Sequence, residues 1–136
     1  MVGIFVSPFV LLLFTHLTYN ITPSMPEGVY WIWPGTQPAR GQTVSLRGEI
    51  KVLWGVPGDT VNVSAAGSRI NNGPLIPMSA PIITDNDYKP YPFGTYKLGE
   101  DQYWVIGEHP RSWDSRYEGP LPQSKIYGTA EAVWTK

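Results

Sequence analysis

Residues 20–31 read NITPSMPEGVYW and hold a serine between two prolines, just behind a strongly apolar start. Proline fixes its own φ angle and restricts the residue before it, so Pro23 and Pro26 limit the backbone on either side of Ser24. One explanation is an ordinary turn, in which serine and proline are common. The other is a nucleophile, whose hydroxyl is weak near neutral pH and must pass its proton to an adjacent base. A nucleophilic Ser24 therefore needs a base from elsewhere in the chain.

Few residues in the chain could supply histidine or thiolate chemistry or hold a metal. There is no cysteine, and the two histidines are His16, inside the apolar start, and His109. A zinc site would have to be built mostly from carboxylates, so we expect no metal and no other cofactor. The ten basic residues form no stripe and the formal net charge is -1, a pattern that does not favour nucleic-acid binding.

The start of the chain is predicted to be a membrane anchor. Residues 2–19 contain no Lys, Arg, Asp or Glu. As a helix they would reach roughly 27 Å, close to a hydrocarbon thickness of about 30 Å, with a kink at Pro8. A cleaved signal peptide and a buried helix are the alternatives, but the exit sequence FTHLTYN offers no Ala-x-Ala cleavage site. We therefore expect an uncleaved single-pass anchor over residues 1–19.

The rest of the chain is rich in turn residues and short strand patterns. The fourteen prolines and fourteen glycines have no period, which favours short strands and turns over a helical bundle. We predict an all-β domain of short antiparallel strands over residues 20–136. Runs of β-branched, aromatic or alternating residues predict strands at 28–33, 42–46, 49–56, 60–63, 103–107 and 125–134, with a hairpin return at 69–73.

Two stretches between these strands show weaker patterns. Residues 73–102 are rich in Pro, Gly and Tyr and predict a meandering connection with one strand near 82–84, whereas residues 108–122 predict a long loop. Within the strand at 49–56, the period of two places Lys51 on the same face as Leu53.

Four short segments, TPSMPEGVY, ARGQTVSL, KVLWGVPGDTV and SWDSRYEGP, occur in this order along the chain. Each is a modest signal alone, because Pro-Gly-Asp by itself is simply a turn. Together, behind an apolar start, they resemble the membrane-anchored serine proteases of the signal peptidase I clan, above all the small TraF-type conjugative transfer peptidases. The resemblance extends over residues 1–136, with the least support from 73–100.

The resemblance implies a Ser/Lys dyad. In the family, the serine before Met is the nucleophile and the lysine at the head of the box ending Gly-x-Pro-Gly-Asp is its general base, which correspond here to Ser24 and Lys51. An ordinary lysine has a pKa of about 10.4 and is charged near neutral pH, whereas removal from water disfavours the charged form. A strand position beside the apolar residues Val52 and Leu53 could remove the amine of Lys51 from water. From the strand pattern alone, Lys51 would instead be an exposed lysine.

The resemblance also implies an oxyanion hole and supporting residues. The backbone N–H of Ser24 would be one oxyanion donor and the hydroxyl of Thr22 the second. Ser112 would orient the lysine amine, and Asp114 and Arg116 would form an ion pair that braces their loop. Considered alone, Thr22 is equally a turn residue, and a surface Asp–Arg pair is usually just solvated.

These matches imply a membrane-anchored serine endopeptidase that processes exported precursor proteins. Residues 1–19 would anchor it in the bacterial inner (cytoplasmic) membrane, and residues 20–136 would form the catalytic domain on the periplasmic, extracytoplasmic side. The implied substrate is an extended precursor segment with small side chains near the cleavage site, from a pilin-like or conjugative transfer protein. The expected partners are this precursor and the membrane, without nucleic acid or metal.

Three alternatives stay open. One is a general signal peptidase I that removes signal peptides from secreted preproteins. Another is a Ser-His-Asp triad with His109 and Asp114, although both would have to bend from one loop toward a serine elsewhere. The third is a non-catalytic anchored β-domain whose Trp and Tyr residues contact a protein partner. The triplets NIT (20–22) and NVS (62–64) match the N-glycosylation pattern and are assigned no role.

Overall fold

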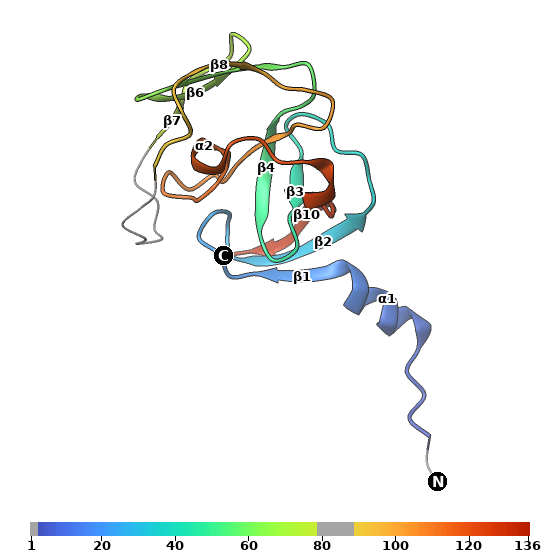
Figure 1. Ribbon diagram of the computed structural model, residues 1–136. Helices are drawn as coiled ribbons and strands as arrows, with labels where there is room; N and C mark the ends of the chain where they lie inside the picture. The colour runs from blue at the N-terminus through green and yellow to red at the C-terminus, as the bar shows by residue number, and fades with distance from the viewer. Residues whose placement is uncertain (1–2, 79–88) are drawn as a thin grey trace.

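In the described part of the chain, the residues form two antiparallel β-sheets, with an N-terminal helix that projects away from them (Figure 1). The computed structural model describes residues 3–78 and 89–136. The larger sheet has six strands in the order β1-β2-β10-β3-β4-β9, and the smaller has four in the order β7-β6-β5-β8. This mostly β, antiparallel architecture confirms the predicted fold class of the domain.

The six-stranded sheet carries Lys51 on one strand and Thr22 and Ser24 in the connection between two others. Its strands are β1 (Leu17–Asn20), β2 (Gly28–Pro34), β3 (Thr43–Ser45), β4 (Ile50–Gly55), β9 (Trp104–Ile106) and β10 (Gly128–Thr135). Five of these six strands overlap strands predicted from the sequence, and β10 follows a short 3-10 helix, η1 (Gln123–Lys125). β1 was not predicted, because three of its four residues, 17–19, lie in the apolar stretch assigned to the anchor.

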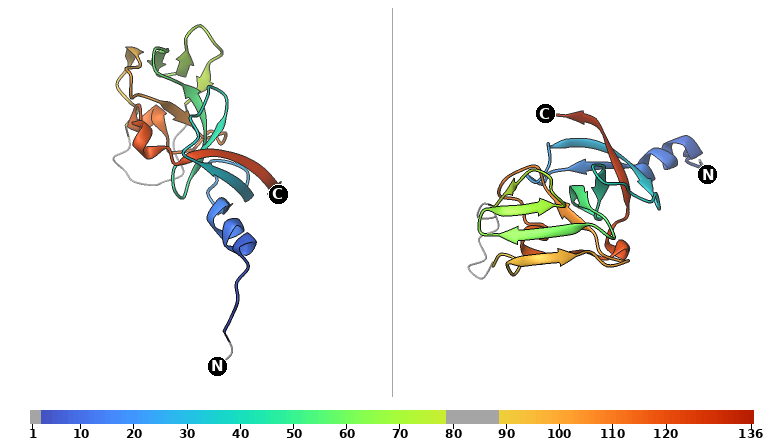
Figure 2. Two further views of the ribbon diagram at one scale, coloured as in Figure 1. Left: turned by 90° about the vertical axis from the view of Figure 1, so that its right-hand side faces the viewer. Right: turned by 90° about the horizontal axis from the view of Figure 1, so that it is seen from above.

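The four-stranded sheet is less well predicted. Its strands are β5 (Thr60–Ser64), β6 (Gly67–Ile70), β7 (Ile76–Pro77) and β8 (Gly94–Lys97). β5, β6 and β8 lie side by side in Figure 2. The sequence predicts β5 and a hairpin return, which is β6, but β7 and β8 fall in the stretch interpreted as a connection. The strand predicted near 82–84 lies outside the described residues.

The two sheets meet over a buried apolar cluster. Trp104 and Ile106 from β9 pack with Val61 and Val63 from β5, together with Ile70 and Leu98. Complete burial of one such side chain contributes about 1.5–3 kcal/mol relative to leaving it exposed. The packing therefore holds β9, and the loop that follows it, at a fixed position.

Alternation along β4 determines where Lys51 points. Lys51 and Leu53 are both buried, whereas Val52 and Trp54 between and beyond them are only partly buried. β4 lies between β3 and β9, so both of its edges are paired. The predicted common face of Lys51 and Leu53 is confirmed, and it is a buried face.

The N-terminal helix is shorter than predicted. α1 (Pro8–His16) is capped by Ser7, whose side chain accepts a hydrogen bond from the backbone N–H of Phe9. The first turn of the helix contains proline, which is favourable at this position. After His16 the chain becomes extended and pairs with β2 as β1. Within residues 3–78 and 89–136, no helix has the length and apolar character needed to cross a membrane.

The predicted long loop at 108–122 contains a single helical turn, which corrects that prediction. α2 (Ser115–Glu118) is capped by Asp114, whose side chain accepts from the backbone N–H of Arg116. Asp is among the favoured residues at this position because its side-chain oxygen satisfies a free N–H of the first turn. The turn is too short for the sequence to show a helical period.

Candidate active site

Ser24 lies in the tight connection between β1 and β2, and it is only 7% exposed. Several contacts fix this connection from different sides. The hydroxyl of Tyr30 donates to the carbonyl oxygen of Pro26 over 2.8 Å, and the N–H of His109 donates to the carbonyl oxygen of Ser24 over 3.1 Å. Met25 is buried in an apolar cluster with Tyr30. The backbone around Ser24 is therefore held by both neighbouring chain segments and the core.

Lys51 reaches Ser24 from the buried face of β4. Its Nζ lies 2.7 Å from Ser24 Oγ and 2.9 Å from Ser112 Oγ, and the residue is 1% exposed. Ser112 Oγ also donates to Ser24 Oγ over 3.0 Å, which closes a triangle of one amine and two hydroxyls. The structure thus brings together the three predicted residues from three separate sequence motifs.

One carboxylate lies at the edge of this triangle. Glu49 Oε2 is 3.4 Å from Lys51 Nζ, and the Glu49 side chain is about half exposed. A pocket of about 250 Å³ opens over Ser24, Lys51 and Ser112, and its walls include Thr22, Glu49 and Trp113. The site therefore has an enclosed amine and an open side from which a ligand can approach.

Asp114 and Arg116 form the predicted ion pair, and it is buried rather than solvated. Arg116 donates from Nε to Asp114 Oδ1 over 2.8 Å and from Nη2 to Oδ2 over 2.7 Å. Its Nη1 donates to the carbonyl oxygen of Pro77 in β7 over 2.7 Å. Loss of one partner of a buried pair is strongly destabilising, by about 3–5 kcal/mol. The pair connects the loop that carries Ser112 to the smaller sheet.

The same loop provides hydrogen-bond acceptors for backbone N–H groups along the outer edge of β9, which is the last strand of its sheet. Ser115 Oγ accepts from the N–H of Val105 over 2.9 Å, and Asp114 Oδ2 accepts from the N–H of Gly107 over 2.9 Å. Buried N–H groups need such partners, and here side chains take the place of a further strand. Asp114 therefore positions Gly107 as well as Arg116.

Gly107 is a site residue that the sequence analysis missed. A Cβ at this position would overlap Ser112 Oγ and would lie 2.6 Å from Ser112 Cβ and 3.0 Å from Ser24 Cβ. Only a hydrogen leaves room for both serines. The available signal was a glycine at the end of the predicted 103–107 strand, which has the same appearance as any turn glycine.

Thr22 lies at the pocket, but its hydroxyl is engaged with another residue. Thr22 Oγ1 donates to Asn20 Oδ1 over 2.6 Å. A threonine hydroxyl has a single proton, so the predicted donation to an oxyanion requires the hydroxyl to turn away from Asn20. Asn20 is a second residue near the site whose contribution the sequence analysis did not recognise.

The residues of the alternative Ser-His-Asp triad have other partners. His109 Nδ1 accepts from the backbone N–H of Arg111 over 3.1 Å. The two carboxylate oxygens of Asp114 accept from Arg116 and from the N–H of Gly107. Neither side chain is arranged as the base and its orienting acid, whereas the lysine amine is in direct contact with Ser24 Oγ.

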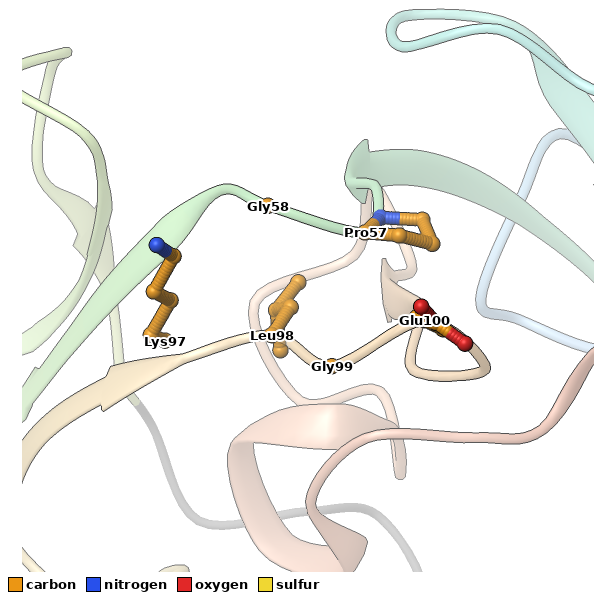
Figure 3. Close-up of a pocket in the computed structure, with 6 residues that line it drawn as sticks. All are labelled: Pro57, Gly58, Lys97, Leu98, Gly99 and Glu100. Carbon is orange, nitrogen blue, oxygen red and sulfur yellow. The ribbon is translucent and has the colours of Figure 1, made fainter.

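A separate pocket of about 490 Å³ lies between the turn before β5 and the segment after β8 (Figure 3). It is lined by Pro57, Gly58, Lys97, Leu98, Gly99 and Glu100. Figure 3 shows Lys97 and Glu100 at opposite ends of this pocket. None of the predicted site residues lines it, so it is separate from the pocket at Ser24.

Residues 1–135 match the family model described as signal peptidase, peptidase S26. The chain therefore belongs to the signal peptidase family, peptidase S26, which confirms the family that the four motifs predict.

Two relatives and one solved structure illustrate this similarity. A probable signal peptidase I-2 of Synechocystis sp. is 35% identical over 86 residues, which are 60% of this chain and 35% of that protein. The plasmid transfer protein TraF of Escherichia coli is 33% identical over 145 residues, covering 85% of this chain and 81% of that protein. A signal peptidase I structure from Enterococcus faecalis covers 69% of this chain and 97% of that one, with 25% identity and a TM-score of 0.43. The chain spans about a third to somewhat over half the length of the first curated relatives it matches.

Proposed function

We propose that the chain is a serine endopeptidase in which Ser24 is the nucleophile and Lys51 the general base. The observation that carries this proposal is the 2.7 Å contact between Lys51 Nζ and Ser24 Oγ, in a site where both residues are buried. Serine–lysine pairs are a recognised variant of the catalytic triad. The family supports peptidase chemistry in general, and the contact supports the proposal that these two residues perform it.

In the proposed reaction, the neutral amine of Lys51 accepts the proton of Ser24 Oγ as this oxygen attacks a peptide carbonyl carbon. The resulting ammonium gives the proton to the leaving amine when the peptide bond breaks, and an acyl ester on Ser24 remains. Water then attacks the ester with Lys51 again accepting a proton, and the lysine ammonium returns this proton to Ser24 Oγ as the ester bond breaks and the second product leaves. Ser112 Oγ, 2.9 Å from Lys51 Nζ, keeps the amine aimed at Ser24 through both steps.

The developing oxyanion needs donors, since removal of one donor in a serine protease costs about 3–4 kcal/mol of transition-state stabilisation. The backbone N–H of Ser24 is the first proposed donor. The hydroxyl of Thr22 is the second, after rotation away from Asn20, because Thr22 lies on the wall of the pocket above Ser24.

The proposed substrate is an exported precursor protein with small side chains near the scissile bond. Support comes from the modest pocket of about 250 Å³ at Ser24 and from relatives named as signal peptidase I and as plasmid transfer protein TraF. The TraF match, which covers most of both chains, favours a pilin-like or conjugative transfer precursor. General removal of signal peptides is the second candidate function, supported by the signal peptidase I relatives.

We further propose that residues 1–19 associate with the inner membrane and that residues 20–136 form the catalytic domain on its periplasmic side. The apolar side chains of α1 support this arrangement, because Phe9, Leu11 and Phe14 are largely exposed in the isolated chain. Large exposed apolar patches mark membrane or protein contacts. An anchored enzyme would meet an anchored precursor at high effective concentration.

The test is cleavage of precursor proteins by the full chain in detergent or vesicles, followed by mass spectrometry of the products. A secreted preprotein and a pilin-like transfer precursor should be compared, so that the better substrate separates the two candidate functions. Ser24→Ala should abolish cleavage while its thermal unfolding stays that of a folded domain. Ser124→Ala, at an exposed serine of η1, is the matched control and should cleave normally. Undiminished cleavage by Ser24→Ala would exclude the proposal, and cleavage of neither precursor by the wild type would favour a binding module.

A further inference from the structure

Asn20, the last residue of β1, is 2% exposed and its side chain lies inside the connection that carries Ser24. Its Oδ1 accepts from the backbone N–H of Thr22 over 3.1 Å and from the Thr22 hydroxyl over 2.6 Å. Its Nδ2 lies 3.2, 3.1 and 3.2 Å from the carbonyl oxygens of Thr22, Met25 and Pro26. An amide group has two donor hydrogens, so these three acceptors share them.

These contacts lie on both sides of Ser24 in the chain. Thr22 precedes the serine, whereas Met25 and Pro26 follow it, and all three carbonyl groups converge on one amide nitrogen. Convergent buried carbonyls require a donor between them, because an unpaired buried polar group is costly. The amide of Asn20 therefore determines the shape of the connection at the position of the serine.

The base of the connection is fixed in the sheet. Asn20 pairs with Gly28 at the end of the β1–β2 ladder, so the connection leaves and returns at this pair. Figure 1 shows the connection between the two strands. Gly28 has a φ of 155° and faces the backbone of Trp134, where a Cβ would not fit. The Asn20 backbone thus has a firm position from which its side chain can hold the turn.

We propose that Asn20 is a positioning residue for the nucleophile, which is a role additional to the dyad and rests on the proposed function. Its amide nitrogen holds the backbone on both sides of Ser24, so that Ser24 Oγ stays within reach of Lys51 Nζ. Its amide oxygen accepts from the backbone N–H of Thr22 and so keeps Thr22 at the pocket wall, from where the hydroxyl can turn to the oxyanion. The NIT triplet at residues 20–22 is then part of the site, with its amide nitrogen enclosed by carbonyl groups rather than open to modification.

Asn20→Asp is the sharpest substitution, because it keeps the size of the side chain. The carboxylate has no donor hydrogens. It would place negative charge beside the three carbonyl oxygens that accept hydrogen bonds from the amide in the wild type. The matched control is Asn62→Asp in β5, where the exposed amide donates to Thr95 Oγ1 over 3.0 Å in the other sheet. Both variants make the same chemical change, but only one makes it beside Ser24.

The experiment measures kcat and KM for precursor cleavage by the full-length variants, together with their thermal unfolding. Asn20→Asp and Asn20→Ala should lower kcat about 100-fold, the loss expected when reacting groups are displaced by about 1 Å, with KM little changed. Asn62→Asp should match the wild type.

Thr22→Val should lower kcat, whereas Thr22→Ser, which keeps the hydroxyl, should retain it. The fold loss of kcat in the double variant Asn20→Ala/Thr22→Val should be smaller than the product of the two single losses, because the two residues share a hydrogen bond.

Full kcat in a folded Asn20→Asp variant, or a loss confined to KM, would overturn the proposal. If Asn20→Asp and Asn20→Ala do not fold, Asn20→Gln decides, because it keeps the amide donors but displaces them by one methylene, and full kcat in this variant would count against the proposal. Ser24→Ala separates the two levels of inference. An active Ser24→Ala variant refutes the proposed function itself, whereas an inactive Ser24→Ala beside a fully active Asn20→Asp refutes only the role of Asn20.

Discussion

Lys51 and Arg40 each join segments that are far apart in the sequence, but their partners differ in chemistry. Lys51 is enclosed, and its amine contacts the hydroxyls of Ser24 and Ser112. Arg40 is half exposed, and its guanidinium contacts both carboxylate oxygens of Asp59. A guanidinium stays charged in proteins, whereas an amine beside hydroxyls has groups with which it can exchange a proton. The first arrangement suits proton transfer, and the second suits a permanent structural link.

The Arg40–Asp59 link also explains why two of the four motifs occur together. Arg40 belongs to ARGQTVSL, and Asp59 ends the Pro-Gly-Asp turn of KVLWGVPGDTV. Asp59 further accepts from the N–H of Val56 over 2.9 Å and from Asn71 Nδ2 over 3.2 Å. One carboxylate thus holds the turn after β4, the segment before β3 and the end of β6. These motif residues support the scaffold, while Ser24, Lys51 and Ser112 form the proposed site.

The comparison predicts the largest effect for Lys51→Met. The unbranched apolar side chain fills similar space but cannot accept a proton, so kcat/KM should fall by about 100- to 10,000-fold. Stability should change little, because the two hydroxyls that lose the amine still pair with each other and Glu49 is about half exposed. Precursor cleavage and thermal unfolding check both results, with the exposed Lys97→Met in β8 as control. Normal cleavage by Lys51→Met would show that the amine is not the base.

Gly107→Ala should have the next largest effect. The new methyl group overlaps Ser112 Oγ and approaches Ser24 Cβ, so the two serines must separate. We expect kcat to fall about 100-fold and the free energy of unfolding to drop by about 1–3 kcal/mol. Gly99→Ala is the control, because the nearest atom to its added Cβ is Gln102 Oε1 at 3.4 Å. An unchanged kcat would mean that the triangle of Ser24, Lys51 and Ser112 tolerates displacement.

Ser112→Ala should have a smaller effect on catalysis than loss of the base. It removes the hydrogen bond between Ser112 Oγ and Lys51 Nζ and the one that Ser112 Oγ donates to Ser24 Oγ, but it leaves the contact between Lys51 and Ser24 in place. A hydrogen bond of about 1.5 kcal/mol corresponds to about a 10-fold loss of kcat. Single-turnover cleavage at several pH values measures it. A loss as large as that of Lys51→Met would instead assign Ser112 a direct part in the reaction.

Asp59→Asn should act on stability and leave activity per folded molecule unchanged. Burial alone would raise the pKa of Asp59, but hydrogen bonds from Arg40, Val56 and Asn71 outweigh burial and lower the pKa below its ordinary value. The stabilisation is therefore present above the unfolded pKa of about 3.9 and is lost as pH falls through the folded pKa. With Arg40 half exposed, we expect about 1 kcal/mol at neutral pH. Equal stability of wild type and variant near pH 7 in urea unfolding would contradict this.

The sequence predicted the strands whose burial alternates or whose ends are marked by turn residues. β2, β4 and β5 are of this kind, and each lies where the pattern places it. β1 was missed because its residues continue an apolar stretch, and pairing with β2 overrides that local pattern. β8 was missed because a strand flanked by proline and glycine shows too few alternating residues, and β5 supplies its hydrogen-bond partners.

The candidate site was accessible from the sequence only through the order of its motifs. No local pattern shows that Lys51 and Ser112, 61 residues apart, converge on Ser24. Gly107 and Asn20 were missed for a related reason. Gly107 matters because a side chain there would collide with Ser112, and Asn20 matters because it donates to carbonyl groups around Ser24. Both are properties of the folded backbone, which a single sequence does not display.

The most direct test of the central claim is to find which residue reacts with a serine-directed phosphonate, and whether that reaction needs Lys51. The full chain and its Lys51→Met variant would be incubated with the reagent, and intact-mass measurement and peptide mapping would follow the adduct. The Ser/Lys assignment predicts a single adduct on Ser24, formed at least about 100-fold more slowly in Lys51→Met. An adduct on another serine, or equal rates in the two proteins, would contradict it.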